Sequence, residues 1–163
     1  MSRRATPALL AATGGTLAAA IAGTLAITGN GGAQTPSPQP TVMHVERQVT
    51  DGGFIDVSPR HRQSPGDAIV ESSVLRDAAG KRVGRAIDHC ITVDHRDTLA
   101  CTGVVLLARG TLIFAGRTGT DGKPSTFAVT GGTQAYAGAR GFIDDVPTGE
   151  NSAKATLTLL PTP

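Results

Sequence analysis

The chain of 163 residues has room for one domain, and with aromatic residues at 3% and no Trp its core must be built from Val, Ile, Leu and Ala. So light a core would be helped by a cross-link or by packing between subunits. Two of the 15 basic residues and none of the 13 acidic residues lie at positions 1–33, so the rest of the chain has a formal net charge of zero and lacks the electrostatic footprint of a nucleic-acid-binding protein.

Residues 1–33 have the form of a secretory signal peptide. Two arginines lie near the start, positions 8–29 carry no charge, and the small residues at 31–33 suit a cleavage site. An uncleaved membrane anchor is the alternative, because the uncharged run is near the ~20 residues that span a bilayer. Its many Ala, Gly and Thr residues favour cleavage. We therefore expect a secreted protein with a Pro-rich tether at 34–41 and a folded domain at 42–163.

The domain is expected to be all-β. Its Gly and Pro residues are spread among short apolar runs, which is typical of strands joined by turns. A first strand is predicted from Val42 to about Val49 and should end at Asp51-Gly52-Gly53. Further strands are predicted over positions 68–75, 82–94, 98–108, 111–118, 126–130, 139–146 and 153–160. Antiparallel strands in this number favour closure into an eight-stranded up-and-down barrel, which leaves no sheet edge, and an open sandwich is the alternative.

The two cysteines, Cys90 and Cys101, flank a turn at residues 95–96. They are equally far from its centre, so in a regular antiparallel hairpin they face each other on one side of the sheet. In an oxidising environment outside the cell we predict a Cys90–Cys101 disulfide, which stabilises the fold by about 2–3 kcal/mol because its loop is short. Free thiols are one alternative. A metal site that uses His89, Asp94, His95 and Asp97 is a weaker one, because no zinc-like spacing appears.

The same register places Asp88 opposite Gly103, on the face that carries the cysteines. If this face is interior, Asp88 is a candidate pocket acid whose pKa would rise by burial. An exterior position is favoured, because Ile87, Ile91 and Val93 crowd the other face of the strand.

A glycine-rich stretch at residues 130–141 separates two predicted strands. Gly131, Gly132, Gly138 and Gly141 permit unusual backbone angles and close approach of another segment, so we predict a tight corner with Tyr136 as its anchoring side chain. A phosphate-binding loop is the alternative, but no Lys-Ser/Thr pair and no helical pattern follow the glycines.

Several short motifs resemble those of allene oxide cyclases and plant dirigent proteins, in order and in spacing over roughly residues 66–160. They are Gly66-Asp67-Ala68-Ile69-Val70, Lys81-Arg82-Val83-Gly84-Arg85-Ala86, Gly116, Val129-Thr130-Gly131-Gly132-Thr133 and Ala139-Arg140-Gly141. The chain is similar to a secreted bacterial member of this superfamily, and the resemblance implies an eight-stranded barrel that binds an apolar small molecule in its mouth. Cyclases steer ring closure there, and dirigent proteins steer radical coupling.

Departures from the family patterns argue against transferring either plant activity. Cys90 lies where a cyclase carries a pocket cysteine, and a disulfide would remove that thiol. Ser73 stands at about the place of a cyclase asparagine, Thr118 at that of a tyrosine, and Ser125 near that of a dirigent arginine.

We expect a secreted barrel that binds an apolar small molecule and steers its cyclisation or isomerisation. Glu46, Glu71 and Asp88 are its candidate acids, and Tyr136 is a candidate ligand contact near the mouth. If the protein is an enzyme, the resemblance implies an isomerase or cyclase; the alternative is a non-catalytic extracellular or envelope-associated binding barrel. A hydrolase is disfavoured, because there is no Gly-x-Ser-x-Gly motif.

We expect no metal, no cofactor and no nucleic-acid partner. Several predicted strands carry apolar residues on both faces, which favours a homo-oligomer, either a dimer or a trimer. The feature that would separate the two functional hypotheses is the polar content of the barrel interior. Buried carboxylates around an open cavity would favour an enzyme, and a barrel filled by Leu and Phe would favour the non-catalytic protein.

Overall fold

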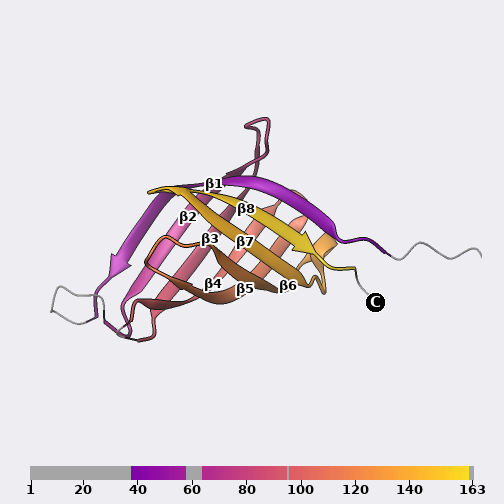
Figure 1. The fold of residues 1–163 in the computed structure, drawn as a ribbon. Helices are drawn as coiled ribbons and strands as arrows, with labels where there is room; N and C mark the ends of the chain where they lie inside the picture. The colour runs from indigo at the N-terminus through magenta and orange to yellow at the C-terminus, as the bar shows by residue number, and fades with distance from the viewer. Residues whose placement is uncertain (1–37, 58–63, 95, 162–163) are drawn as a thin grey trace, which may run out of the picture. The chain divides into compact units, whose positions relative to one another are not determined.

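The computed structural model describes residues 38–57, 64–94 and 96–161. These residues form a closed antiparallel barrel in which each strand pairs with the next and the last pairs with the first (Figure 1). The strands are β1 (Thr41–Ile55), β2 (Ala68–Arg76), β3 (Arg82–Thr92), β4 (Thr98–Leu107), β5 (Gly110–Gly119), β6 (Ser125–Gly132), β7 (Gly141–Gly149) and β8 (Ser152–Leu159). The predicted eight-stranded up-and-down barrel is confirmed, and the open sandwich is excluded.

The predicted signal segment and residues 34–37 of the tether lie outside the described residues. In the part of the chain that the structure describes, no helix has the length and apolar character needed to cross a membrane.

Strand β1 is longer than predicted and strongly bent. The break expected at Asp51-Gly52-Gly53 is wrong, because β1 continues through these residues to Ile55. The register against β2 shifts between Val49 and Asp51, so a bulge bends the strand without ending it. Figure 1 shows this bend, which lets one strand pair with β8 along its first part and with β2 along its second.

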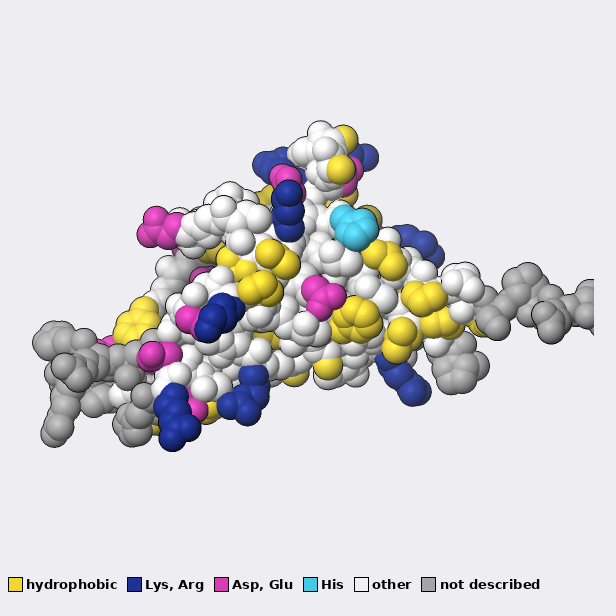
Figure 2. Space-filling view, viewed as in Figure 1, with side chains coloured by type: hydrophobic (Ala, Val, Ile, Leu, Met, Phe, Trp, Pro, Cys, Tyr) yellow, Lys and Arg dark blue, Asp and Glu magenta, His cyan; other side chains and the backbone are white. Residues whose placement is uncertain are grey.

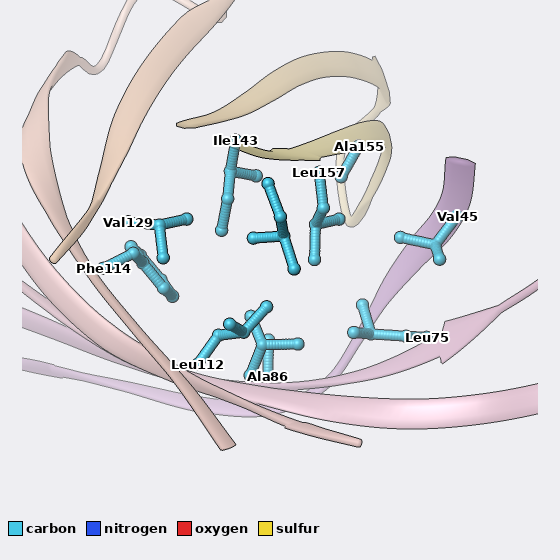
Figure 3. Packing of buried hydrophobic residues seen from close by; sticks show 11 residues of the cluster. Val45, Leu75, Ala86, Leu112, Phe114, Val129, Ile143, Ala155 and Leu157 are labelled. Carbon is cyan, nitrogen blue, oxygen red and sulfur yellow. The ribbon is translucent and has the colours of Figure 1, made fainter. Parts of the chain in front are cut away.

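Inward-facing side chains form an apolar core. The alternation is clearest in β8, where Ala153, Ala155, Leu157 and Leu159 are buried between less buried or exposed neighbours. Figure 3 shows how side chains from strands around the barrel converge on its axis. The buried cluster consists of Val45, Leu75, Ala86, Val105, Leu112, Phe114, Val129, Ile143, Ala155, Leu157 and Leu159.

The glycine corner is confirmed between β6 and β7. Gly132 ends β6, a short 3₁₀ helix η1 (Gln134–Tyr136) follows, and Gly141 begins β7. Gly141 has φ +151°, and a Cβ there would collide with the carbonyl oxygen of Thr158 on β8. Tyr136 packs against the apolar core, as expected of an anchoring side chain. Since successive turns of an up-and-down barrel alternate between its ends, this corner lies at the same end as the β2–β3 and β4–β5 turns.

Candidate functional site

The barrel encloses a cavity of about 220 Å³ that opens at the end opposite the glycine corner. Its rim includes Gly119, Gly122 and Lys123 at the turn between β5 and β6, and part of the apolar core, with Leu157 and Val105, lines its interior. Ligand pockets of proteins usually measure about 300–1,000 Å³. This cavity therefore suits a compact molecule.

The cavity wall has two unlike halves. Strands β4, β5 and β6 contribute mainly apolar groups, with Leu99, Phe114 and Phe127 among them. The rings of Phe114 and Phe127 meet edge to face, with their centroids 5.5 Å apart. Near the mouth, the hydroxyls of Thr118 and Ser125 are hydrogen-bonded to each other. The lining is therefore apolar on this half, with a small polar group at its rim.

The charged groups come from the other half of the wall. Arg47 on β1, Glu71 on β2, Asp88 on β3 and Asp145 on β7 all line the cavity. Strand β8 lies between β7 and β1 and contributes only small or apolar groups, including Ala155. One half of the barrel thus presents aromatic and aliphatic surface to a ligand, and the other presents ionisable groups.

The cysteine pairing is confirmed, and its face is interior. Cys90 lies opposite Cys101 in the β3–β4 register, the two are joined by a disulfide, and both are buried in the cavity wall. Asp88 lies opposite Gly103 in the same register. The expectation that Asp88 faces outward is therefore wrong. Ile87 and Ile91, which were expected to be buried, are each 37% exposed on the outer surface.

The physical reason for this error is the narrow interior. A small closed barrel leaves little space inside, so the inward positions of β3 hold the small side chains of Ala86 and Cys90, while the larger isoleucines face out. Gly103 adds to this arrangement. A Cβ at Gly103 would collide with the ring of Phe114 and would lie 2.7 Å from the Cβ of Asp88.

Burial raises the pKa of Asp88 to about 6. The positive charge of Arg47 acts against this shift, whereas the negative charges of Glu71 and Asp145 add to it. No hydrogen bond or ion pair holds the Asp88 carboxylate among the described residues. A carboxyl group with this pKa exchanges its proton near neutral pH, as a general acid or base requires.

Arg47 holds the other two carboxylates in place. Its Nη1 lies 3.3 Å from Glu71 Oε2, and its Nη2 lies 3.0 Å from Asp145 Oδ2. Nη1 also donates to the hydroxyl of Ser73, which is fully buried. Although burial opposes it, the surrounding carboxylates, first Asp145, then Asp88 and Glu71, raise the pKa of Arg47. Arg47 Nε and Asp145 Oδ1 are buried and have no hydrogen-bond partner in the described part of the chain.

The structure places the predicted acids in different positions. Glu71 and Asp88 line the cavity, but Glu46 is exposed on the outside of β1, so it is not a pocket acid. Arg47 and Asp145 were not predicted. The signal for Arg47 was present in the alternation, because it follows the buried Val45 by two positions. Asp145 follows the buried Ile143 in the same way.

Tyr136 does not lie at the mouth as expected, because its corner is at the opposite end of the barrel. Its contact with a ligand stays a prediction. Asp94, weighed as a metal ligand, caps the β3–β4 turn and accepts hydrogen bonds from the backbone N–H groups of Arg96 and Thr98. Among the described residues, no three His, Cys, Asp or Glu side chains lie together as a metal site would require.

No family model and no curated protein matches the chain. Among solved structures, a pyocyanin demethylase is similar with 23% identity and a TM-score of 0.67, over 74% of this chain and 100% of that one. The Diels-Alderase AbmU from Streptomyces koyangensis is similar with 16% identity and a TM-score of 0.63, over 76% of this chain and 64% of that one. A pterocarpan synthase dirigent protein is similar with 17% identity and a TM-score of 0.60, over 74% of this chain and 93% of that one. At these identities the likeness shows the fold, a barrel of the kind found in cyclases and dirigent proteins.

Proposed function

We propose that this barrel binds a small, largely apolar molecule in its cavity and steers its cyclisation or isomerisation. The observation that carries the proposal is the position of Asp88 beside Gly103 and the ring of Phe114. The Asp88 carboxylate has no bonding partner among the residues that the structure describes. Solved structures of the same fold include a Diels-Alderase and a pterocarpan synthase dirigent protein, which supports a role in steering the reaction of a bound small molecule.

The wall of β4, β5 and β6 holds the apolar body of the ligand in one pose, and holding a reactive chain in a productive pose lowers the barrier to ring closure. Asp88 gives or takes a proton at the reacting end, an effect worth about 10²- to 10⁴-fold in rate. Arg47 holds the carboxylates of Glu71 and Asp145 in fixed positions in the wall that carries Asp88.

Binding without turnover is the second candidate, and one observation favours it. Both terminal nitrogens of Arg47 are already engaged, by Glu71 and Ser73 on one side and by Asp145 on the other. A guanidinium held in this way links β1 to β2 and β7, and this structural role does not require a reaction.

The binding part is tested by native mass spectrometry of the full chain purified from culture. We expect a co-purifying compound in the wild-type protein and its loss in Ala86→Trp, which fills the cavity from β3. The matched control is Arg85→Trp, which places the same ring on the outer surface of the same strand. Absence of a compound from the wild-type protein, together with failure to bind an apolar fluorescent dye, would overturn the proposal.

The catalytic part is tested with the compound so identified. Asp88→Asn keeps the size of the side chain but removes the exchangeable proton, so we expect retained binding and a loss of turnover of at least ~10²-fold. Turnover equal to wild type in this variant would remove Asp88 from the chemistry. If the wild-type protein returns the compound unchanged, the second candidate stands.

We also propose that the protein acts outside the cell. The support is the leader-like form of residues 1–33 and the disulfide, since disulfides persist mainly in oxidising compartments. Fractionation of cells that express the full chain, followed by N-terminal sequencing of the product, tests this. We expect a mature N-terminus near residue 34 in the exported fraction, and recovery of the intact chain from the cytoplasm alone would contradict it.

A further inference from the structure

We infer that the ligand of this cavity carries a positively charged nitrogen on a compact apolar body. This inference rests on the proposed function and gives its ligand a chemical class. Four observations lead to it: the charge balance of the wall, the carboxylate oxygens that have no partner among the described residues, the arrangement of Arg47, and the aromatic surface on the other side.

The charged wall is unbalanced. One guanidinium, that of Arg47, is set against the three carboxylates of Glu71, Asp88 and Asp145. Lys123 does not correct the balance, because its side chain is 79% exposed at the rim and is paired with Asp121 at 2.7 Å. With all groups ionised the wall therefore carries a formal charge of minus two, and negative charge in a poorly hydrated cavity attracts a cation more strongly than it would in water.

Two of the carboxylates retain bonding capacity. Arg47 reaches Asp145 through Oδ2 only, and Asp145 Oδ1 is buried without a donor among the described residues. Asp88 has no donor in the described residues at all. Burying a carboxylate oxygen without a hydrogen bond costs free energy. A ligand that brings a positively charged donor to this wall would reduce that cost.

The arrangement of Arg47 disfavours an anionic ligand. Its two terminal nitrogens face Glu71, Ser73 and Asp145, and only Nε has no partner in the described residues. An anion that bound the guanidinium through two nitrogens would therefore have to displace a carboxylate. An anion would also add to the negative charge already present in the wall. Both effects act against carboxylates and phosphates in this cavity.

The opposite wall suits the remainder of such a ligand. Phe114 lies beside Gly103, next to Asp88, and meets Phe127 edge to face. Aromatic rings bind apolar groups and also attract cations over their faces. A flat bicyclic cation would thus place its charge near Asp88 and its rings against the phenylalanines, within the roughly 220 Å³ that the cavity offers.

The experiment compares two probes of the same shape by isothermal titration calorimetry on the full chain at pH 7.5. N-methylquinolinium carries the charge, and 1-methylnaphthalene is its neutral counterpart. We expect the cation to bind at least ~10-fold more tightly, a difference equivalent to about 1.4 kcal/mol. In Asp88→Asn we expect this preference to fall at least ~5-fold, with binding of 1-methylnaphthalene unchanged, because one carboxylate is lost without a change in volume.

The matched control is Asp144→Asn. Asp144 precedes Asp145 on β7 but faces outward, where its Oδ1 accepts a hydrogen bond from Thr126. The preference for the cation should be unchanged in this variant. If 1-methylnaphthalene binds as tightly as N-methylquinolinium, or if Asp88→Asn leaves the preference intact, this inference is wrong and the proposed function survives. If neither probe binds, this inference is also wrong, and the proposed function is decided by the co-purification and dye-binding experiments.

Discussion

Asp88 is inside the barrel because β3 alternates and because Gly103 leaves space beside it. Its raised pKa has a consequence for stability that can be measured. Unfolded, the carboxyl group has its ordinary pKa of about 3.8, and folded its pKa is about 6. Between these values the native state keeps a proton that the unfolded state loses, so the wild-type protein loses stability as the pH rises from about 4 to 6.

We therefore predict that Asp88→Asn is more stable than wild type above pH 6. The gain should reach up to roughly 3 kcal/mol, because each unit of pKa shift corresponds to about 1.36 kcal/mol. It should become small near pH 4, where the native wild-type protein holds a proton at this position. The groups that act on Asp88, namely Arg47, Glu71, Asp145 and His89, are present in both proteins, so the two differ only in the charge at position 88 and its interactions. Urea denaturation at pH 4, 5.5 and 7.5 gives the difference. A constant gap at every pH would contradict the prediction.

At the residue scale, the sequence was sufficient to predict that Cys90 pairs with Cys101. It was not sufficient to predict that both face the interior of the barrel. The index spacing of a hairpin determines which residues are opposed, and it placed Asp88 opposite Gly103 correctly. Which side is interior depends on side-chain volume around the whole barrel, and β3 has apolar residues on both sides. The ion pairs of Arg47 join β1 to β2 and β7, and no local pattern predicts contacts between strands so far apart in the chain.

At the scale of the element, the disulfide joins the two strands that form part of the cavity wall. We predict that Cys90→Ala with Cys101→Ala lowers the free energy of unfolding by about 2–3 kcal/mol, because the unfolded chain regains the freedom of a short loop. Urea denaturation measures this. Reduction of the wild-type protein should produce a similar loss, and an unchanged denaturation midpoint in both experiments would be inconsistent with a stabilising disulfide.

The glycine corner offers a matched pair of substitutions. We predict that Gly141→Ala costs at least about 3 kcal/mol or prevents folding, because the new Cβ collides with the Thr158 carbonyl oxygen and φ is +151°. Gly131→Ala should change stability by less than about 1 kcal/mol, since nothing lies within 4 Å of its Cβ position and its φ is not in the positive region. Thermal unfolding followed by circular dichroism compares the two. Equal effects would mean that the corner is not held by the close approach at Gly141.

The ends of the strands were predictable where turn residues separate apolar runs, and less predictable where a strand bends. Gly52 and Gly53 were predicted to end the first strand, yet β1 continues through them. Pairing with β2 supplies hydrogen bonds that the local sequence does not reveal. The bulge after Val49 is what allows one strand to leave β8 and follow β2.

At the scale of the whole molecule, the outer surface carries more apolar side chains than a single barrel requires. Figure 2 shows hydrophobic side chains gathered in patches among charged ones on one face. A row crosses β3, β4 and β5, where Ile87 lies opposite Val104 and Val104 lies opposite Ile113. Ile113 is 42% exposed. Contiguous exposed apolar residues of this kind commonly mark an interface between protein chains.

We predict that the protein forms a dimer or a trimer through this row, because association would remove Ile87 and Ile113 from water. Sedimentation velocity across a range of concentrations should show an oligomer for the wild-type chain and a monomer for the double variant Ile87→Lys, Ile113→Lys. Val42→Lys is the control, because Val42 is exposed on β1, away from the row, and its substitution should leave the oligomer intact. Both lysine variants should keep the cavity and its ligand, since all three positions face outward. A wild-type chain that sediments as a monomer at every concentration would show that the row is ordinary solvent-exposed surface.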